Sequence, residues 1–133
     1  MKKYREDAVV PFTPAADYSA KKGYLVTLSG STATLNASAA VAAKGVILDG
    51  NDTTAGYAGE KVSVGLLGAV KGTVPMRLSG AVTAGAYVQQ ANDGTVVTDA
   101  GSGARVLVGV ALQSGVAGEN IEVAPLTPIT LGS

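Results

Sequence analysis

The sequence of 133 residues contains no cysteine, no histidine and no tryptophan. Without cysteine and histidine there are no disulfides, no zinc sites built on these ligands, no cysteine nucleophiles and no triads with an imidazole base. The remaining polar residues show no convergent pair of an acid and a base. We therefore expect no catalytic residues, no metal and no cofactor, and we expect that the chain is not an enzyme.

Aromatic and charged residues are scarce. Aromatics make up 5% of the chain and charged residues 15%, whereas hydrophobic residues reach 47%. The apolar share is therefore mostly alanine, valine and leucine, which favours closely approaching strands over a bulky helical core. The formal net charge of zero gives no electrostatic footprint for nucleic acid. Zero net charge with a positive mean hydropathy is typical of a protein that functions in an assembly.

Long hydrophobic runs are also missing. No stretch reaches the roughly 20 apolar residues of a membrane helix. The basic start at Met1–Asp7 is not followed by the apolar run of a signal peptide. We expect a soluble protein that is made in the cytoplasm and has no membrane partner.

Glycine is abundant, with 18 residues, and it recurs in a cassette of the form Ala-Gly-x-x-Val/Ile. Glycine suits the end of a tight turn because it adopts positive φ freely, and the β-branched residue three places later favours a strand. Each cassette therefore predicts a turn that starts a strand. The copies are Ala58–Val62, Ala84–Val88 and Ala117–Ile121, with a looser copy at Lys22–Val26, so strands are expected after Gly23, Gly59, Gly85 and Gly118.

The cassettes belong to a longer duplication. Gly45-Val46-Ile47-Leu48 returns as Gly109-Val110-Ala111-Leu112, 64 positions later, and Tyr24-Leu25-Val26 matches Tyr87-Val88-Gln89 at an offset of 63. Convergence in a chain rich in glycine, alanine and valine is the alternative, but the conserved order of the elements favours duplication. We predict an all-β fold, a small β-barrel or sandwich-like domain built from two similar halves, at about residues 20–67 and 83–125.

Residues 1–19 differ from the rest because they mix charges with Pro11 and Pro14. We expect an extended N-terminal arm outside a single β domain at residues 20–133, with a frayed end as the alternative. The apolar residues Val9, Val10, Pro11 and Phe12 predict that the arm lies on the body of the domain, on a neighbouring subunit or on another protein surface. Deletion of residues 2–19 should then leave the β domain folded.

The clearest strand signal runs from Val70 to Leu78. Apolar residues alternate with Lys71, Thr73, Pro75 and Arg77, which predicts a half-exposed strand. Pro75 cannot donate to a ladder, so the strand should lie at an edge or bulge there. Lys71 and Arg77 on the exposed face are the second candidate contact surface.

The stretch from Asp49 to Glu60 imitates the oxygen-ligand spacing of a calcium loop. Thr54 stands where such a loop needs glycine, and no helices are expected on either side. An ordinary oxygen-rich turn is therefore the better interpretation.

From about Ala20 to Pro128 the sequence resembles the capsid cement, or head-decoration, proteins of tailed bacteriophages and prophages. The resemblance lies in the order of four segments: Gly68-Ala69-Val70, Ala84-Gly85-Ala86-Tyr87-Val88, Val108-Gly109-Val110-Ala111-Leu112 and Ala117-Gly118-Glu119-Asn120-Ile121-Glu122-Val123.

This resemblance implies a small β-barrel protein that binds the outside of a capsid lattice, often as a homotrimer. Its partners would be the major capsid protein and further copies of itself, and its location would be the virion. It would stabilise the expanded head without enzymatic activity. The alternatives are a β-rich domain of a phage tail or fibre and a small ligand-binding β-barrel.

Overall fold

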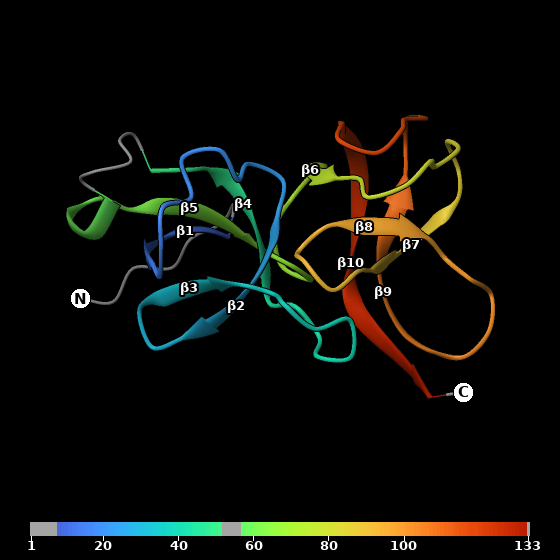
Figure 1. The fold of residues 1–133 in the computed structure, drawn as a ribbon, viewed down its shortest axis with the longest axis horizontal. Coiled ribbons are helices and arrows are strands. Elements are labelled where there is room, and N and C mark those ends of the chain that lie inside the picture. Colours follow the sequence, from blue (N-terminus) through green and yellow to red (C-terminus); the bar gives the residue numbers. More distant parts are fainter. Residues whose placement is uncertain (1–7, 52–56, 133) are drawn as a thin grey trace.

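A computed structural model describes residues 8–51 and 57–132 of the chain. The first five strands form a closed barrel, and the other five form a second, curled sheet beside it (Figure 1). The all-β prediction is confirmed. The barrel contains β1 (Val9–Pro14), β2 (Leu25–Ser29), β3 (Thr32–Leu35), β4 (Gly45–Asp49) and β5 (Val62–Leu66), with a 3-10 turn η1 (Tyr57–Gly59) before β5. The second sheet contains β6 (Val74–Arg77), β7 (Tyr87–Gln90), β8 (Val96–Thr98), β9 (Ala104–Ala111) and β10 (Asn120–Gly132).

The two sheets have the same topology. The barrel has the order β1-β3-β2-β4-β5, in which β5 returns to β1, and the second sheet has the order β6-β10-β9-β7-β8. Thus β1 to β5 correspond one by one to β6 to β10. The barrel is closed by a parallel pairing of β1 with β3. The second sheet is open, with one isolated parallel bridge between Leu78 and Val96 at the equivalent place. The expected two similar halves are confirmed, but β1 and β6 lie outside their expected bounds of about 20–67 and 83–125. The halves are called the first half (β1–β5) and the second half (β6–β10).

The strand registers agree residue by residue. Leu25 pairs with Val46 in the first half, and Tyr87 pairs with Val110 in the second. Tyr87 is therefore the counterpart of Leu25, an offset of 62, and the sequence match of Tyr24 with Tyr87 was wrong by one residue. A shift of one residue turns a side chain to the other face of a sheet. The correction therefore decides which of these side chains point outward.

The recurring glycines have definite structural tasks. Gly23, Gly85 and Gly118 adopt φ values of 90°, 94° and 90°, and strands follow each of them and Gly59, as predicted. Gly45 serves close packing instead. A Cβ there would overlap Val64 Cγ1 and lie 3.0 Å from the Gly65 oxygen. Its counterpart Gly109 is crowded in the same way by Val123 and Ala124.

Side chains fill the interior of both halves, and they occupy equivalent positions. In the first half these are Tyr18, Val26, Ala33, Ile47, Val62 and Val64. In the second half they are Val82, Val88, Val96, Ala111, Ile121 and Val123. Small barrels of this kind have interiors just wide enough for side chains. Among the described residues, buried side chains therefore occupy the interiors of both halves.

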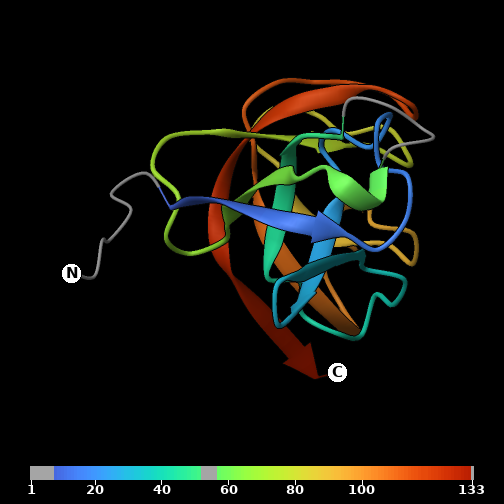
Figure 2. The same ribbon diagram turned by 90° about the vertical axis from the view of Figure 1, so that its left-hand side faces the viewer.

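The N-terminal segment is part of the first barrel. Val9–Pro14 forms β1, which pairs antiparallel with β5 and parallel with β3, and in Figure 2 it crosses the front of the barrel in blue. The segment is extended, as expected, but a boundary at residue 19 would cut through the barrel. Its Val10-Pro11-Phe12 corresponds to Val74-Pro75-Met76 of β6. Residues 1–7 of the expected arm lie outside the described part of the chain.

The two halves are joined by backbone and side-chain hydrogen bonds. The Leu25 N–H donates to the Gly94 oxygen at 2.7 Å, and the Arg77 N–H donates to the Gly23 oxygen at 3.0 Å. The Gln90 amide is buried and bridges the Ala43 N–H (2.7 Å) and the Val41 oxygen (2.8 Å). Buried polar groups that are satisfied in this way fix one arrangement of two packed units.

Candidate interaction surface

The apolar residues proposed for the arm are largely used by the first half itself. Val9, Val10 and Phe12 are half-buried, and Phe12 packs against the interior of the barrel. Only Pro11 is exposed. These four residues do not form a free apolar patch, because β5 and β3 flank the strand that carries them.

Lys71 and Arg77 differ in their surroundings. Lys71 is exposed before β6, whereas Arg77 is half-buried at the end of β6 and its N–H donates to Gly23 across the junction. The predicted alternation is confirmed from Val74 to Leu78, since Val74, Met76 and Leu78 are buried. Residues 70–73 of the predicted strand are wrong, because they precede β6 and Gly72 is exposed. The predicted edge position of this strand is also confirmed, because β6 ends the strand order of its sheet. The structure places β1 and β6 in different halves and does not bring the two candidate surfaces together.

An open groove of about 500 Å³ lies beside β6. It is lined by Lys22, Thr73, Val74, Pro75, Gln113, Asn120, Ile121 and Glu122. Its polar groups are engaged with one another: Thr73 Oγ1 donates to Glu122 Oε1 (2.8 Å), and Asn120 Nδ2 donates to the Lys22 oxygen (3.1 Å). The groove is therefore a seam between elements rather than a set of groups aimed at a ligand.

The oxygen-rich stretch after β4 is used for structure. The Asn51 side chain is buried, and its Oδ1 accepts a hydrogen bond from the Tyr18 N–H at 2.6 Å while its Nδ2 donates to Asp17 at 2.8 Å. Residues 52–56 of the calcium-like spacing lie outside the described residues. Within residues 8–51 and 57–132, no group of three or more acidic side chains is placed to hold a metal ion.

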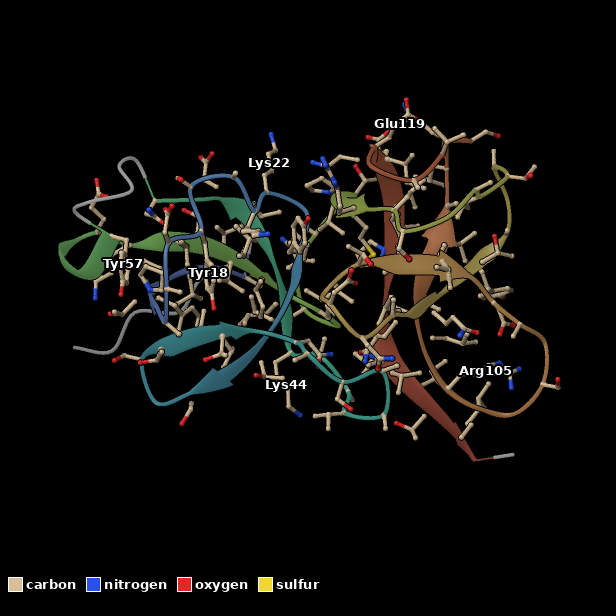
Figure 3. All side chains as sticks on the ribbon, viewed as in Figure 1. Tyr18, Lys22, Lys44, Tyr57, Arg105 and Glu119 are labelled. Atoms are coloured by element: carbon tan, nitrogen blue, oxygen red, sulfur yellow. The ribbon has the colours of Figure 1, made fainter. Side chains whose placement is uncertain are left out.

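Asp99 and Arg105 form an ion pair across the loop between β8 and β9. The Gly101 N–H and the Arg105 guanidinium both donate to the Asp99 carboxylate and hold the pKa of that carboxyl below its usual value. The labelled charged side chains Lys22, Lys44, Arg105 and Glu119 lie well apart in Figure 3. They cannot act on one bound molecule together.

One apolar surface was missed by the sequence analysis. Tyr87 and Leu112 are 51% and 45% exposed, and the half-buried Val110 pairs with Tyr87 across the strands. Exposed apolar side chains that lie together on a sheet form a candidate binding face. Tyr87 was visible in the sequence as part of a glycine cassette. Because it was matched with Tyr24, the sequence did not reveal that the true counterpart of Tyr87 is the fully buried Leu25.

Two further findings bear on identity. In the described part of the chain, no helix has the length and apolar character needed to cross a membrane. Comparison of the sequence with protein-family models and with curated proteins finds no match.

Proposed function

We propose that this chain is a structural virion protein that binds the outside of a phage capsid lattice and stabilises the expanded head. Its partners are the major capsid protein and further copies of itself, as a homotrimer. It is made in the host cytoplasm and ends on the capsid surface. It uses no cofactor, binds neither nucleic acid nor membrane, and has no enzymatic activity.

The observation that supports this proposal best is that side chains fill the interiors of both halves while an apolar face is exposed on the outside. Tyr87 and Leu112 stand on the outside of a packed sheet, so the feature available for recognition is a surface and not a cavity. Surfaces of this kind suit repeated contacts between proteins, which gain strength when symmetry multiplies them.

The segments that carry the family resemblance have structural roles in the fold. Gly68 adopts a φ of 90° in the connection between the halves, where a Cβ would approach Thr127 Oγ1 at 2.6 Å. Gly85 starts β7, and Gly109 allows β10 to approach β9. The resemblance therefore concerns residues that build the scaffold. It supports a shared fold, whereas the role itself has to be tested on the surface of the protein, because a fold alone does not determine a function.

The acidic residues give no support to an enzyme. Glu122 accepts from Thr73, and Glu119 accepts from the Val116 N–H at 2.9 Å. Asp99 is paired with Arg105. In the described part of the chain, these three carboxylates stabilise their own turns or strands, and their hydrogen bonds go to a hydroxyl, to backbone N–H groups and to a guanidinium.

The filled interiors also weigh against a small ligand-binding barrel. Val26, Ile47, Val62 and Val64 are fully buried inside the first half and leave no room for a guest molecule. A β-rich domain of a tail or fibre fits the same packing and stays the alternative, to be separated by experiment.

The test is cosedimentation of the purified protein with heads of the phage or prophage whose genome encodes it. We expect saturable binding to expanded heads and none to unexpanded heads or to tails. Lys71→Glu tests the exposed segment before β6 and should weaken binding. Lys44→Glu is the matched control, since Lys44 is also exposed but belongs to the first half. Binding to tails alone would favour the alternative, and binding to neither would refute a virion role.

A further inference from the structure

The outer strands of the second half are covered by other parts of the chain. This half is an open sheet, and its outer strands are β6 and β8. At β6, Pro75 has no N–H to offer, and the Arg77 N–H donates to the Gly23 oxygen of the first half at 3.0 Å. At β8, the Val96 oxygen accepts from the Ser79 N–H at 3.0 Å. Contacts of this kind keep the edge of a sheet from pairing with another chain.

A third edge belongs to β10, which continues past the end of β6. The pairing of β6 with β10 stops at Val123, whereas β9 follows β10 as far as Gly132. In the described part of the chain, no strand pairs with the other side of Ile129–Gly132. This end of β10 projects from the body of the molecule in both Figure 1 and Figure 2. Since alternate residues of a strand direct their N–H and C=O groups to opposite sides, the free side carries unpaired backbone groups.

The part of β10 just before this edge is protected. Pro125 and Pro128 have no N–H, and the register shifts between Pro125 and Ile129. Gly68, in the connection between the halves, lies beside Thr127. Prolines, irregular registers and charges are the usual means of blocking a free edge. Residues 129–132 contain neither a proline nor a charge, and we call them the open edge.

The open edge is complementary to itself. Ile129 is 45% exposed and Leu131 is half-buried, and the two lie on one face of β10 because they are two residues apart. When two copies pair antiparallel about Thr130, Ile129 of each copy lies opposite Leu131 of the other. Both cross-strand pairs are then apolar, which stabilises a sheet.

Electrostatic repulsion does not oppose this approach of two identical strands. Residues 123–132 are uncharged. Arg105 lies opposite Leu131 on β9, and its guanidinium is neutralised by the ion pair with Asp99. A second copy therefore supplies a free edge, matching apolar side chains and no opposing charge.

We propose that two copies pair antiparallel through their open edges, so that their second sheets join into one continuous sheet. The contact uses the same surface on both copies and is therefore isologous, which limits it to a pair. It goes beyond the proposed function, because it needs neither the capsid nor the contacts of the homotrimer. On a capsid it joins a copy in one trimer to a copy in the next.

The absence of cysteine from the chain allows a direct test of this pairing and of its register. Opposite Cα atoms in an antiparallel pair are roughly 4.5–5.5 Å apart, a distance that a disulfide spans. Thr130→Cys places two thiols opposite each other at the two-fold axis, and oxidation by air should join the full chains into covalent dimers on a non-reducing gel. Thr127→Cys is the matched control. Thr127 is an exposed threonine of the same strand, but in this register it does not lie opposite itself.

Sedimentation measures the contact without a cross-link. Ile129→Lys adds a charge to the open edge, and it should weaken pairing by about tenfold or more and halve the mass of the associated species. Val116→Lys is the matched control, because Val116 is 57% exposed and lies between β9 and β10, at the other end of β10. This control should sediment like the wild type, and circular dichroism would check that both variants keep the fold.

Several outcomes would overturn the proposal. One is a Thr130→Cys chain that cross-links no better than Thr127→Cys, and another is an Ile129→Lys chain that associates like the wild type. If the Thr130→Cys thiol formed dimers only after deletion of residues 2–7, those residues would cover the open edge. If heads protected this thiol from alkylation while the free protein did not pair, the capsid would cover it.

The two proposals can fail separately. Head binding without pairing would refute this contact alone. Pairing in solution without head binding would refute the capsid role alone.

Discussion

The two halves of the molecule have the same backbone arrangement but fill it differently. Tyr18 reaches into the first half, where its hydroxyl accepts a hydrogen bond from the Leu35 N–H at 3.0 Å, and the small Ala33 lies in the same interior. The second half has Val82 and Val96 at these positions. One large and one small residue in the first half thus correspond to two valines of intermediate size in the second half. The comparison shows that a duplicated backbone tolerates different side chains when the total volume is kept.

The halves also differ in closure, because the first half is a closed barrel and the second half is an open sheet. In the first half β1 pairs with β3 over two residue pairs, whereas in the second half one bridge between Leu78 and Val96 stands in this place. Closure of the first half therefore depends on β1. The strands of the second half are held together more by the long β10, which pairs with both β6 and β9.

Deletion of residues 2–19 should have the largest effect. It removes β1 with Phe12, and it removes Tyr18 from the interior, where burial of each such side chain contributes roughly 1.5–3 kcal/mol. Against a total stability of about 5–15 kcal/mol, we expect the first half to unfold. Circular dichroism and amide spectra of the purified variant would measure this.

Deletion of residues 2–7 is the comparison, because it leaves β1 complete. We expect this shorter deletion to keep the folded spectrum. If the longer deletion also kept it, β1 would be an attached arm, as the sequence alone suggested.

Gly45→Ala and Gly109→Ala test whether the halves are equivalent in energy as well as in geometry. Each added methyl group would strike a valine of the opposite strand, and overpacking of this kind costs about 1–3 kcal/mol. We expect the two losses of unfolding free energy to be similar in urea denaturation. Gly80→Ala is the control, since its Cβ would make an ordinary contact of 3.8 Å with Val97. A large loss in one half only would show that the repeats have diverged in packing.

Gln90→Leu tests the junction by giving the second half the residue that the first half has at this position, Leu28. The substitution leaves the Ala43 N–H and the Val41 oxygen without their partner, at a cost of about 2 kcal/mol. Thermal unfolding should become less cooperative, because the amide joins the two halves. Gln89→Leu, on the neighbouring residue of the same strand, is the control and should keep a single transition.

Much of this fold was predictable from the sequence, and the exceptions have physical causes. The glycine cassettes and the alternation around Pro75 predicted the strands because turns and pleats impose local residue types. The role of Val9–Pro14 was missed because its partner β5 lies about 50 residues away, and proline in a barrel strand opposes local propensity. The exposed surface at Tyr87 and Leu112 was missed because it depends on which copy of a repeated surface is covered, and that is a property of the assembled halves.

The smallest expected effect concerns an equivalent pair of turns. Asn36 and Asp99 occupy matching positions, and each side-chain Oδ1 accepts from the N–H two residues later, at Ser38 (3.2 Å) and Gly101 (3.1 Å). Only Asp99 is ionisable, and hydrogen bonding from Gly101 and Arg105 holds its pKa below the ordinary value of 3.8. A lowered folded-state pKa gives stability that is present above the unfolded pKa and lost as the pH falls through the folded one.

Asp99→Asn makes the second turn neutral, like the first. We expect a loss of about 0.5 kcal/mol at neutral pH, because the pair is near the surface, and the difference from the wild type should vanish below the folded-state pKa of Asp99. Urea denaturation of both chains from neutral pH to pH 3 measures this, with Asp93→Asn as a control in the β7–β8 turn. A difference that stayed constant through the acid range would mean that the turn geometry, and not the charge of Asp99, stabilises the second half.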